Sequence, residues 1–194
     1  MKDIVIATGN QGKINDFKHI FPEHNVIGIT TLLPDFDVEE TGTTFEENAA
    51  LKAEAASHLL GKTVIADDSG LSVDSLNGAP GIYSARYAGT EKDDAANIKL
   101  LLKNLQGESE RAARFVCVIA LSEPGHPTQT FRGEVEGVIA EEERGEHGFG
   151  YDPIFYLPER DQTMAELVSE EKAEISHRRK AIDKLTEYLE GQTS

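Results

Sequence analysis

A glycine-rich turn follows the first apolar run of the chain and carries residue types that suit phosphate binding. Thr8-Gly9-Asn10-Gln11-Gly12-Lys13 lies between a predicted strand at 3–7 and a predicted helix at 13–21. A helix start presents unpaired backbone N–H groups and a partial positive charge, to which Lys13 adds a full charge. The Walker A pattern is excluded, because two residues separate the glycines and Ile14 follows the lysine. A phosphate-binding turn and an ordinary glycine turn with a surface lysine both remain open.

Two acidic doublets are candidates for a magnesium site. Glu39-Glu40 precedes a predicted helix at 43–60, and Asp67-Asp68 follows a predicted strand at 63–66. Magnesium prefers a few carboxylate oxygens plus water, and it binds substrate phosphates at the same time. We expect a turn after residue 66 to aim the second doublet. Because other acidic pairs occur along the chain, ordinary surface charge is the alternative.

Two segments of the C-terminal half are candidates for recognising a base. Gly148-Phe149-Gly150-Tyr151-Asp152-Pro153 predicts an accessible loop, whose rings could stack on a base and whose Asp152 could hydrogen-bond its edge. The alternative is a tight turn whose rings fill the core. Lys172 and Ser176-His177-Arg178 place cations at a predicted helix start, where the helix dipole disfavours them. A bound anion and pairing with nearby acids would each relieve that conflict.

Other kinds of chemistry lack the residues they need. Lys52 borders the apolar stripe of helix 43–60, and it either reaches into a cleft or extends to solvent. The single cysteine, Cys117, lies in an apolar run and is interpreted as a buried structural thiol. The six histidines show no HExxH spacing, and GxSxG is absent, which argues against a zinc site and a serine nucleophile.

Composition restricts the partners of the chain. Its 194 residues carry 35 acids and 19 Lys or Arg, a net charge of −16, which repels a polyanion such as DNA or RNA. No apolar run approaches the length of a membrane span, and the N-terminus does not resemble a signal peptide. We therefore expect a cytoplasmic protein that binds neither nucleic acid nor membrane.

The remaining pattern predicts an α/β fold with a mixed sheet. Strands alternate with helices at first, a predicted hairpin of strands 114–121 and 128–139 follows, and helices close the chain. Thr43 or Thr44 can cap helix 43–60, and Asp93 can cap a helix that ends at Leu105. We expect residues 1–194 to form a single domain of two lobes, which meet in the segment 76–89.

Five ordered motifs of the chain resemble those of the inosine triphosphate pyrophosphatase (Ham1-like) family. They are ATGNQGK (7–13), EETGTTFEENAALKA (39–53), ADDSGLSVDSLNGAPGIYSARYAG (66–89), GFGYDPIF (148–155), and EL, EEK and SHR within 166–178. The resemblance implies an elongated mixed sheet flanked by helices, two lobes with a central substrate cleft, and a homodimer. It also implies a Mg²⁺-dependent pyrophosphohydrolase that converts purine nucleoside triphosphates with a non-standard base (ITP, dITP, XTP) to the monophosphate and pyrophosphate.

The resemblance also implies a role for individual residues. Glu39 and Asp68 would bind Mg²⁺, and Asp68 would be the proton acceptor. The remaining candidates would contact the nucleotide: Thr8, Gly9, Asn10, Gln11, Gly12, Lys13, Lys52 and Ser69 near the phosphates and sugar, and Phe149, Gly150, Tyr151, Asp152, Lys172, His177 and Arg178 near the base.

Overall fold

The computed structural model describes residues 3–192, in which seven strands form one mixed sheet. The sheet order is β2-β1-β3-β4-β5-β6-β7, and β1 pairs in parallel with β2 and β3, whereas β5, β6 and β7 pair antiparallel. The strands are β1 (Asp3–Ile6), β2 (Asn25–Gly28), β3 (Val64–Val73), β4 (Ala112–Ser122), β5 (Gln129–Ile139), β6 (Phe155–Leu157) and β7 (Gln162–Thr163). The predicted α/β fold with a mixed sheet is confirmed.

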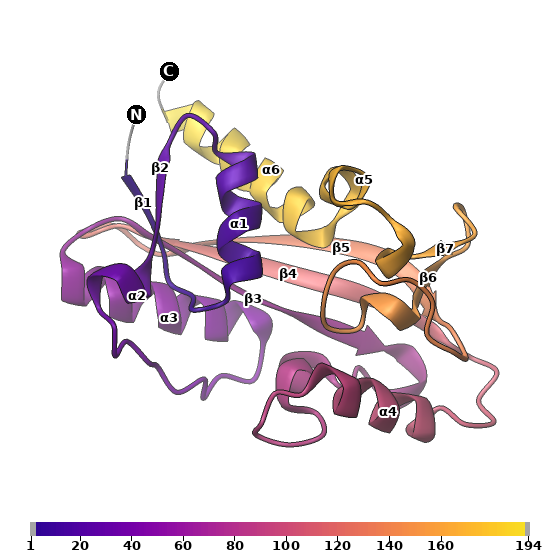
Figure 1. Ribbon diagram of the computed structural model, residues 1–194. Helices are drawn as coiled ribbons and strands as arrows, with labels where there is room; N and C mark the ends of the chain where they lie inside the picture. The colour runs from indigo at the N-terminus through magenta and orange to yellow at the C-terminus, as the bar shows by residue number, and fades with distance from the viewer. Residues whose placement is uncertain (1–2, 193–194) are drawn as a thin grey trace. The chain divides into compact units, whose positions relative to one another are not determined.

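Six α-helices of the described residues accompany this sheet (Figure 1). They are α1 (Gln11–Ile20), α2 (Ile29–Leu32), α3 (Phe45–Leu60), α4 (Asp94–Asn104), α5 (Ser169–Ile175) and α6 (His177–Gln192). Short 3₁₀ turns occur at Asp74–Leu76, Gly81–Arg86, Asp152–Ile154 and Met164–Glu166. The long helices agree with the predicted ones, since their caps are readable: Thr44 accepts from Glu47 N, and Asp93 accepts from Ala96 N.

Strand β3 is longer than predicted, so the expectation of a turn after residue 66 is wrong. The strand continues to Val73 and contains both Asp67, which is fully buried, and Asp68, which is 6% exposed. In a sequence, two adjacent carboxylates indicate that a buried strand has ended, because charged groups are rarely buried without partners. Here lysines from α1 and α3 supply the partners, and the strand runs on.

Four short elements were not predicted: α2, α5, β6 and β7. Each spans seven residues or fewer, which is too short to show a hydrophobic period. Thr163 and Glu166 form a capping box at the 3₁₀ turn Met164–Glu166.

The described residues divide into two compact units. The first comprises 3–68, 117–133 and 179–192, and the second comprises 69–116 and 134–178, so that β3, β4 and β5 contribute to both. In the first unit α1 lies beside β2 (Figure 1), and Phe17, Ile65, Ile119 and Ile182 belong to one apolar core. Cys117 is buried in that core and is not part of a disulfide. Within residues 3–192, none of the helices combines the length and apolarity of a membrane span.

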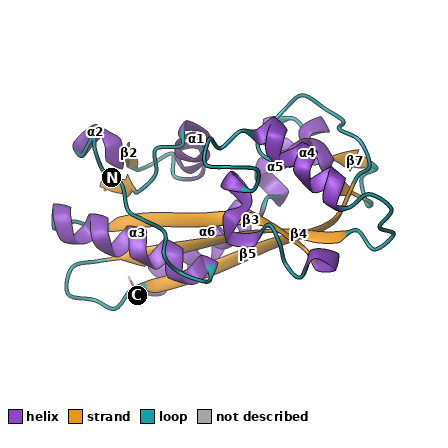
Figure 2. Ribbon diagram, turned by 90° about the horizontal axis from the view of Figure 1, so that it is seen from below, coloured by secondary structure: helices purple, strands orange, loops and turns teal. Residues whose placement is uncertain are grey.

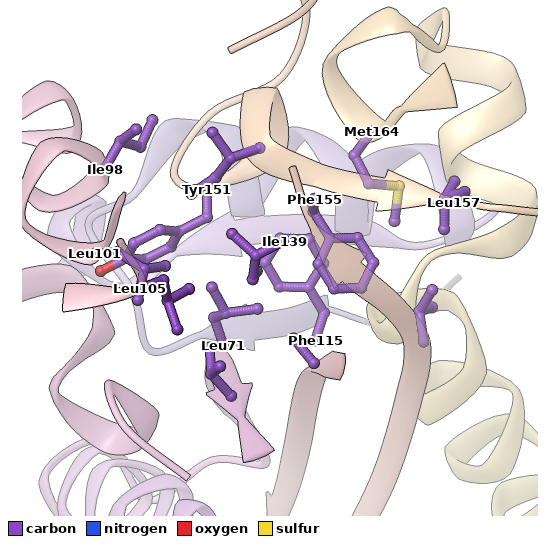
Figure 3. Close-up of a cluster of buried hydrophobic side chains, with 14 of the residues drawn as sticks. Leu71, Ile98, Leu101, Leu105, Phe115, Ile139, Tyr151, Phe155, Leu157 and Met164 are labelled. Atoms are coloured by element: carbon purple, nitrogen blue, oxygen red, sulfur yellow. The ribbon is translucent and has the colours of Figure 1, made fainter. Parts of the chain in front are cut away.

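The second unit has its own core (Figure 3). Ile98 and Leu101 of helix α4, and Leu105 directly after it, belong to the same cluster as Phe115 of β4 and Phe155 of β6. The rings of Phe115 and Phe155 have centroids 4.2 Å apart. This core supports the segment 148–155, in which the predicted aromatic loop lies.

Candidate functional site

The first candidate site is a group of two lysines and three carboxylates in the first unit. Lys13 Nζ lies 3.2 Å from Asp67 Oδ2, and Lys52 Nζ lies 3.0 Å from Glu40 Oε1. Lys52 Nζ also donates to the carbonyl oxygen of Asp67 at 2.5 Å, so this lysine reaches inward rather than to solvent. Together with Asp68 these residues form the carboxylate–lysine cluster (Lys13, Glu40, Lys52, Asp67 and Asp68). With three carboxylates against two ammonium groups, the cluster is negative by one charge when every group is ionised.

Asp68 has the properties of a proton acceptor. Its pKa is raised to about 7, mainly by burial; Lys52 and Lys13 oppose the shift, and Glu40 and Asp67 add to it. A group with such a pKa is readily protonated and deprotonated near neutral pH. Its Oδ2 is buried and has no hydrogen-bond partner among residues 3–192. Ser69 follows directly in β3 and is half-buried; its predicted contact with substrate stays a prediction.

The acidic loop before α3 separates the two glutamates of the first doublet. Residues 33–44 connect α2 to α3 (Figure 2), and Gly42 N donates to Asn48 Oδ1 of α3 at 2.8 Å. Glu39 is exposed, whereas Glu40 pairs with Lys52 and raises the pKa of Asp68. Glu40 is therefore a member of the cluster that sequence reasoning missed. The doublet itself was the only signal, and a loop without periodicity does not tell which residue faces inward.

The cluster suits a divalent cation by its donor chemistry. Carboxylate oxygens are the donors that Mg²⁺ prefers, and Mg²⁺ commonly takes only one or two of them while keeping several waters. The buried Oδ2 of Asp68 is an available acceptor, and the excess negative charge would attract a cation. Residues 3–192 contain no group of three or more His, Cys, Asp or Glu arranged around a metal position. A cation here would accordingly draw on few protein ligands.

The glycine turn opens α1 in a geometry that suits phosphate. Asn10 caps the helix by accepting from Lys13 N at 3.2 Å, and Thr8 Oγ1 accepts from Asn10 N at 3.1 Å. The helix begins at Gln11, two residues earlier than predicted, so Lys13 lies in its first turn. The start of the helix and the Lys13 ammonium both favour an anion, and in this structure the N–H groups of Asn10 and Lys13 donate to side chains while Lys13 Nζ pairs with Asp67.

The second candidate site is the aromatic loop, Gly148–Pro153, in the second unit. Asp152 Oδ2 accepts from Phe149 N at 3.0 Å and from Lys172 Nζ at 2.5 Å. Lys172 Nζ also lies 4.6 Å from the centre of the Phe149 ring, while 41% of Phe149 stays exposed. The loop therefore offers an accessible aromatic ring beside a paired lysine, as base recognition requires.

The cations at the start of α6 are buried beside this loop. Burial raises the pKa of Asp152, against the opposing effects of Lys172, the Phe149 amide and Arg178. Arg178 is 3% exposed, and His177 stacks on Phe115 with ring centroids 5.0 Å apart. The structure thus brings Phe149, Asp152, Lys172 and Arg178 together.

The two aromatic residues of the loop behave differently. Tyr151 is 5% exposed and belongs to the core of the second unit (Figure 3). Its hydroxyl donates to the carbonyl oxygen of Ser84 at 2.6 Å, and burial raises its pKa. The sequence left open whether the rings of this loop fill the core or are accessible. Tyr151 fills the core, whereas Phe149 is accessible. Only the backbone of Tyr151 remains for a ligand.

Replacing Gly148 with alanine should distort the aromatic loop. Gly148 has φ +78°, and a Cβ there would lie 2.1 Å from Asp152 Oδ2 and 3.2 Å from Lys172 Nζ. We expect a loss of about 3 kcal/mol in the free energy of unfolding, measured by urea denaturation. Gly150→Ala is the matched control, because φ is +62° but a Cβ there meets nothing within 4 Å; it should cost about 1 kcal/mol. Equal losses would contradict the clash with Asp152.

The chain is similar to known proteins over almost its whole length. A model of the Ham1 family matches residues 4–188. A curated protein of Staphylococcus aureus named dITP/XTP pyrophosphatase is 64% identical over 192 residues, covering 99% of this chain and 98% of its own. Among solved structures, the Ham1 protein of S. aureus has a TM-score of 0.91 at 63% identity, covering 98% of this chain and 99% of its own. A HAM1 protein of Coxiella burnetii has a TM-score of 0.90 at 43% identity, and the match covers 98% of this chain and 100% of the Coxiella chain. The chain belongs to the Ham1 family.

Proposed function

We propose that this protein is a pyrophosphohydrolase that converts ITP, dITP and XTP to the corresponding monophosphate and pyrophosphate. The observation that carries the proposal is Asp68, a buried carboxylate with a pKa of about 7 in a cluster whose two lysines pair with Asp67 and Glu40. A proton acceptor among cations suits the attack of water on a polyphosphate, which needs charge neutralisation and positioning more than covalent chemistry. The names of the curated relatives, dITP/XTP pyrophosphatase, support the substrate class.

In this proposal Asp68 takes a proton from the attacking water. The water attacks the α-phosphorus, and pyrophosphate leaves with its charge neutralised by Lys13, Lys52 and the backbone N–H groups at the start of α1. The phosphates and the sugar are contacted by the glycine turn and by the residue after Asp68, namely Thr8, Gly9, Asn10, Gln11, Gly12 and Ser69. The reaction requires no covalent intermediate with the protein.

Magnesium is the proposed cofactor. Asp68 would hold it together with Glu40, whose carboxylate belongs to the cluster, in place of the exposed Glu39 predicted from the resemblance. Bound there, the cation would supply charge neutralisation for the polyphosphate. Separate substitution of Glu39 and of Glu40 distinguishes which of the two is the cation ligand.

Base selection is assigned to the second unit. Phe149 offers its exposed ring for stacking, Gly150 and Tyr151 offer backbone groups, and Lys172, His177 and Arg178 lie near Asp152 or against the adjoining core. Inosine and xanthosine carry a 6-oxo acceptor where adenosine carries an amine. Buried donors left without an acceptor would therefore penalise ATP.

Pyrophosphate release from dITP, ITP, XTP, GTP and ATP tests the proposal, with Mg²⁺ and with EDTA. We expect release from the first three that depends on Mg²⁺, with ATP slower by about a hundredfold or more because it lacks the 6-oxo acceptor. GTP carries this acceptor, so its slower release must come from its 2-amino group. Equal rates with ATP would contradict the substrate class. If no substrate reacts although ITP binds, the protein is a nucleotide-binding regulatory module instead.

We further propose that the protein works as a cytoplasmic homodimer without nucleic-acid or membrane partners. The net charge of −16 supports the absence of a nucleic-acid partner, since such a surface repels polyanions. Its substrates, free nucleoside triphosphates, support the cytoplasm.

A further inference from the structure

A hydrogen bond ties the aromatic loop to helix α4. Gly150 N donates to Asp94 Oδ2 at 2.9 Å, across a separation of 56 residues in the chain. Asp94 is the first residue of α4 and was not among the site residues that the sequence predicted. Both residues belong to the second unit. The contact joins a regular helix to a loop that we assign to base recognition.

Beside this hydrogen bond the loop and the helix line a cavity. A cavity of about 210 Å³ is lined by Asp94, Ala95 and Ile98 of α4 and, on the loop, by residues 145–150 among others. At the cavity the hydrogen bond to Asp94 constrains the Gly150 amide, because close packing against the helix is lacking at this point. The next residue, Tyr151, is held separately by its packing in the core of the second unit.

Phe149 lies between two anchored amides. Its own N–H donates to Asp152 Oδ2, and the next N–H, that of Gly150, donates to Asp94 Oδ2. Gly148 and Gly150, on either side of the ring, both adopt positive φ, at +78° and +62°. Glycine readily leaves such conformations, so the two carboxylates restrict a segment that is intrinsically flexible. They thereby fix the backbone that carries the exposed Phe149 ring.

We propose that Asp94 is a positioning residue for base recognition, which acts by holding Gly150 and hence the ring of Phe149. This inference rests on the proposed function of the aromatic loop. Asp94 does not touch the reacting groups, so its loss should weaken nucleotide binding rather than slow the chemical step. The KM for ITP and XTP should rise, while kcat stays unchanged.

Neighbouring residues of α4 provide the controls. Asp94→Ala removes the acceptor, whereas Asp94→Asn keeps a side-chain oxygen that can accept from Gly150 N. Asp93→Ala removes the N-cap of the same helix, since Asp93 Oδ1 accepts from Ala96 N at 3.2 Å. It therefore weakens α4 without removing the contact to Gly150, which separates loss of helix stability from loss of the tether.

The experiment measures amide hydrogen exchange at Gly150 by NMR together with kcat and KM for ITP and XTP. For Asp94→Ala we expect exchange at Gly150 and both KM values to rise about tenfold, with kcat within about twofold of the original. Asp94→Asn and Asp93→Ala should retain the original exchange and KM. Unchanged exchange in Asp94→Ala, or the same KM change in Asp93→Ala, would overturn the proposal.

The two readouts separate this inference from the proposed function. If the unmodified protein hydrolyses none of the triphosphates, the proposed function fails, and the exchange measurement still decides whether Asp94 holds Gly150. If the protein is active and Asp94→Ala loosens Gly150 without changing KM, the positioning role is refuted while the function stands.

Discussion

Asp68→Asn is expected to lower turnover of ITP by about a thousandfold and to stabilise the metal-free protein above pH 7. The loss of turnover follows because an amide cannot accept the proton of the attacking water. The gain in stability follows because burial destabilises the charged carboxylate of Asp68 in the folded protein. This burial is the main reason why its pKa is raised to about 7. The same burial thus serves the reaction and weakens the fold.

The sign of the stability change depends on pH. The pKa of Asp68 in the folded protein lies above its ordinary value of 3.8, so folding takes up a proton between these two pKa values. The folded state is therefore favoured most at low pH, and its stability falls as the pH rises from about 4 through 7. Asparagine resembles the protonated form at every pH. At pH 8 the mutant should therefore gain on the order of 4 kcal/mol in the free energy of unfolding, and at pH 4 it should gain almost nothing.

Thermal unfolding in EDTA at pH 4 and pH 8 measures this difference, and pyrophosphate release with Mg²⁺ at pH 8 measures turnover. Using the two pH values provides the control within one pair of proteins. A mutant that keeps its turnover would remove Asp68 from the mechanism. Equal melting temperatures at pH 8 would show instead that burial does not raise the pKa of Asp68.

Glu40→Gln should lower activity by about a hundredfold, whereas Glu39→Gln should leave it within about twofold. Glu40 belongs to the carboxylate–lysine cluster through its 3.0 Å contact with Lys52, and Glu39 is exposed. The two variants differ by one position and remove the same charge. Any general electrostatic effect on the acidic surface should therefore be equal in both.

The dependence of activity on Mg²⁺ concentration distinguishes a cation ligand from a structural residue. In Glu40→Gln the Mg²⁺ concentration for half-maximal rate should rise by about tenfold or more, and saturating Mg²⁺ should restore part of the activity. The reverse result, a defect in Glu39→Gln alone, would support the assignment that the resemblance implied. It would also require the loop at 33–44 to rearrange when substrate binds.

Much of the fold could be predicted because its longest elements carry local signals. Helix α3 is capped at its start by Thr44 and at its end by Gly61 with φ +62°, and both signals are readable in sequence. Strand β3 was cut short in the prediction, since Asp67 and Asp68 look like the end of a strand. Their burial depends on Lys13 and Lys52, which are distant in sequence, and local patterns do not report such pairing.

The candidate site shows the same limit. The glycine turn, the acidic doublets and the aromatic loop were recognisable as motifs, and Lys52 was recognisable as ambiguous. Which glutamate faces the lysine, and which aromatic ring is accessible, depend on the backbone path through a loop. Tyr151 illustrates this, because only the structure shows its hydroxyl bonded to the carbonyl oxygen of Ser84.

The buried position of Cys117 has a consequence for the conditions under which such an enzyme must work. Nitrosating agents convert amino groups of purines to oxo groups, and the same agents attack accessible thiolates. The only cysteine of the chain is enclosed in the core of the first unit, where a thiol is unreactive. The chemistry that creates the proposed substrates therefore finds no accessible thiol in the protein that removes them.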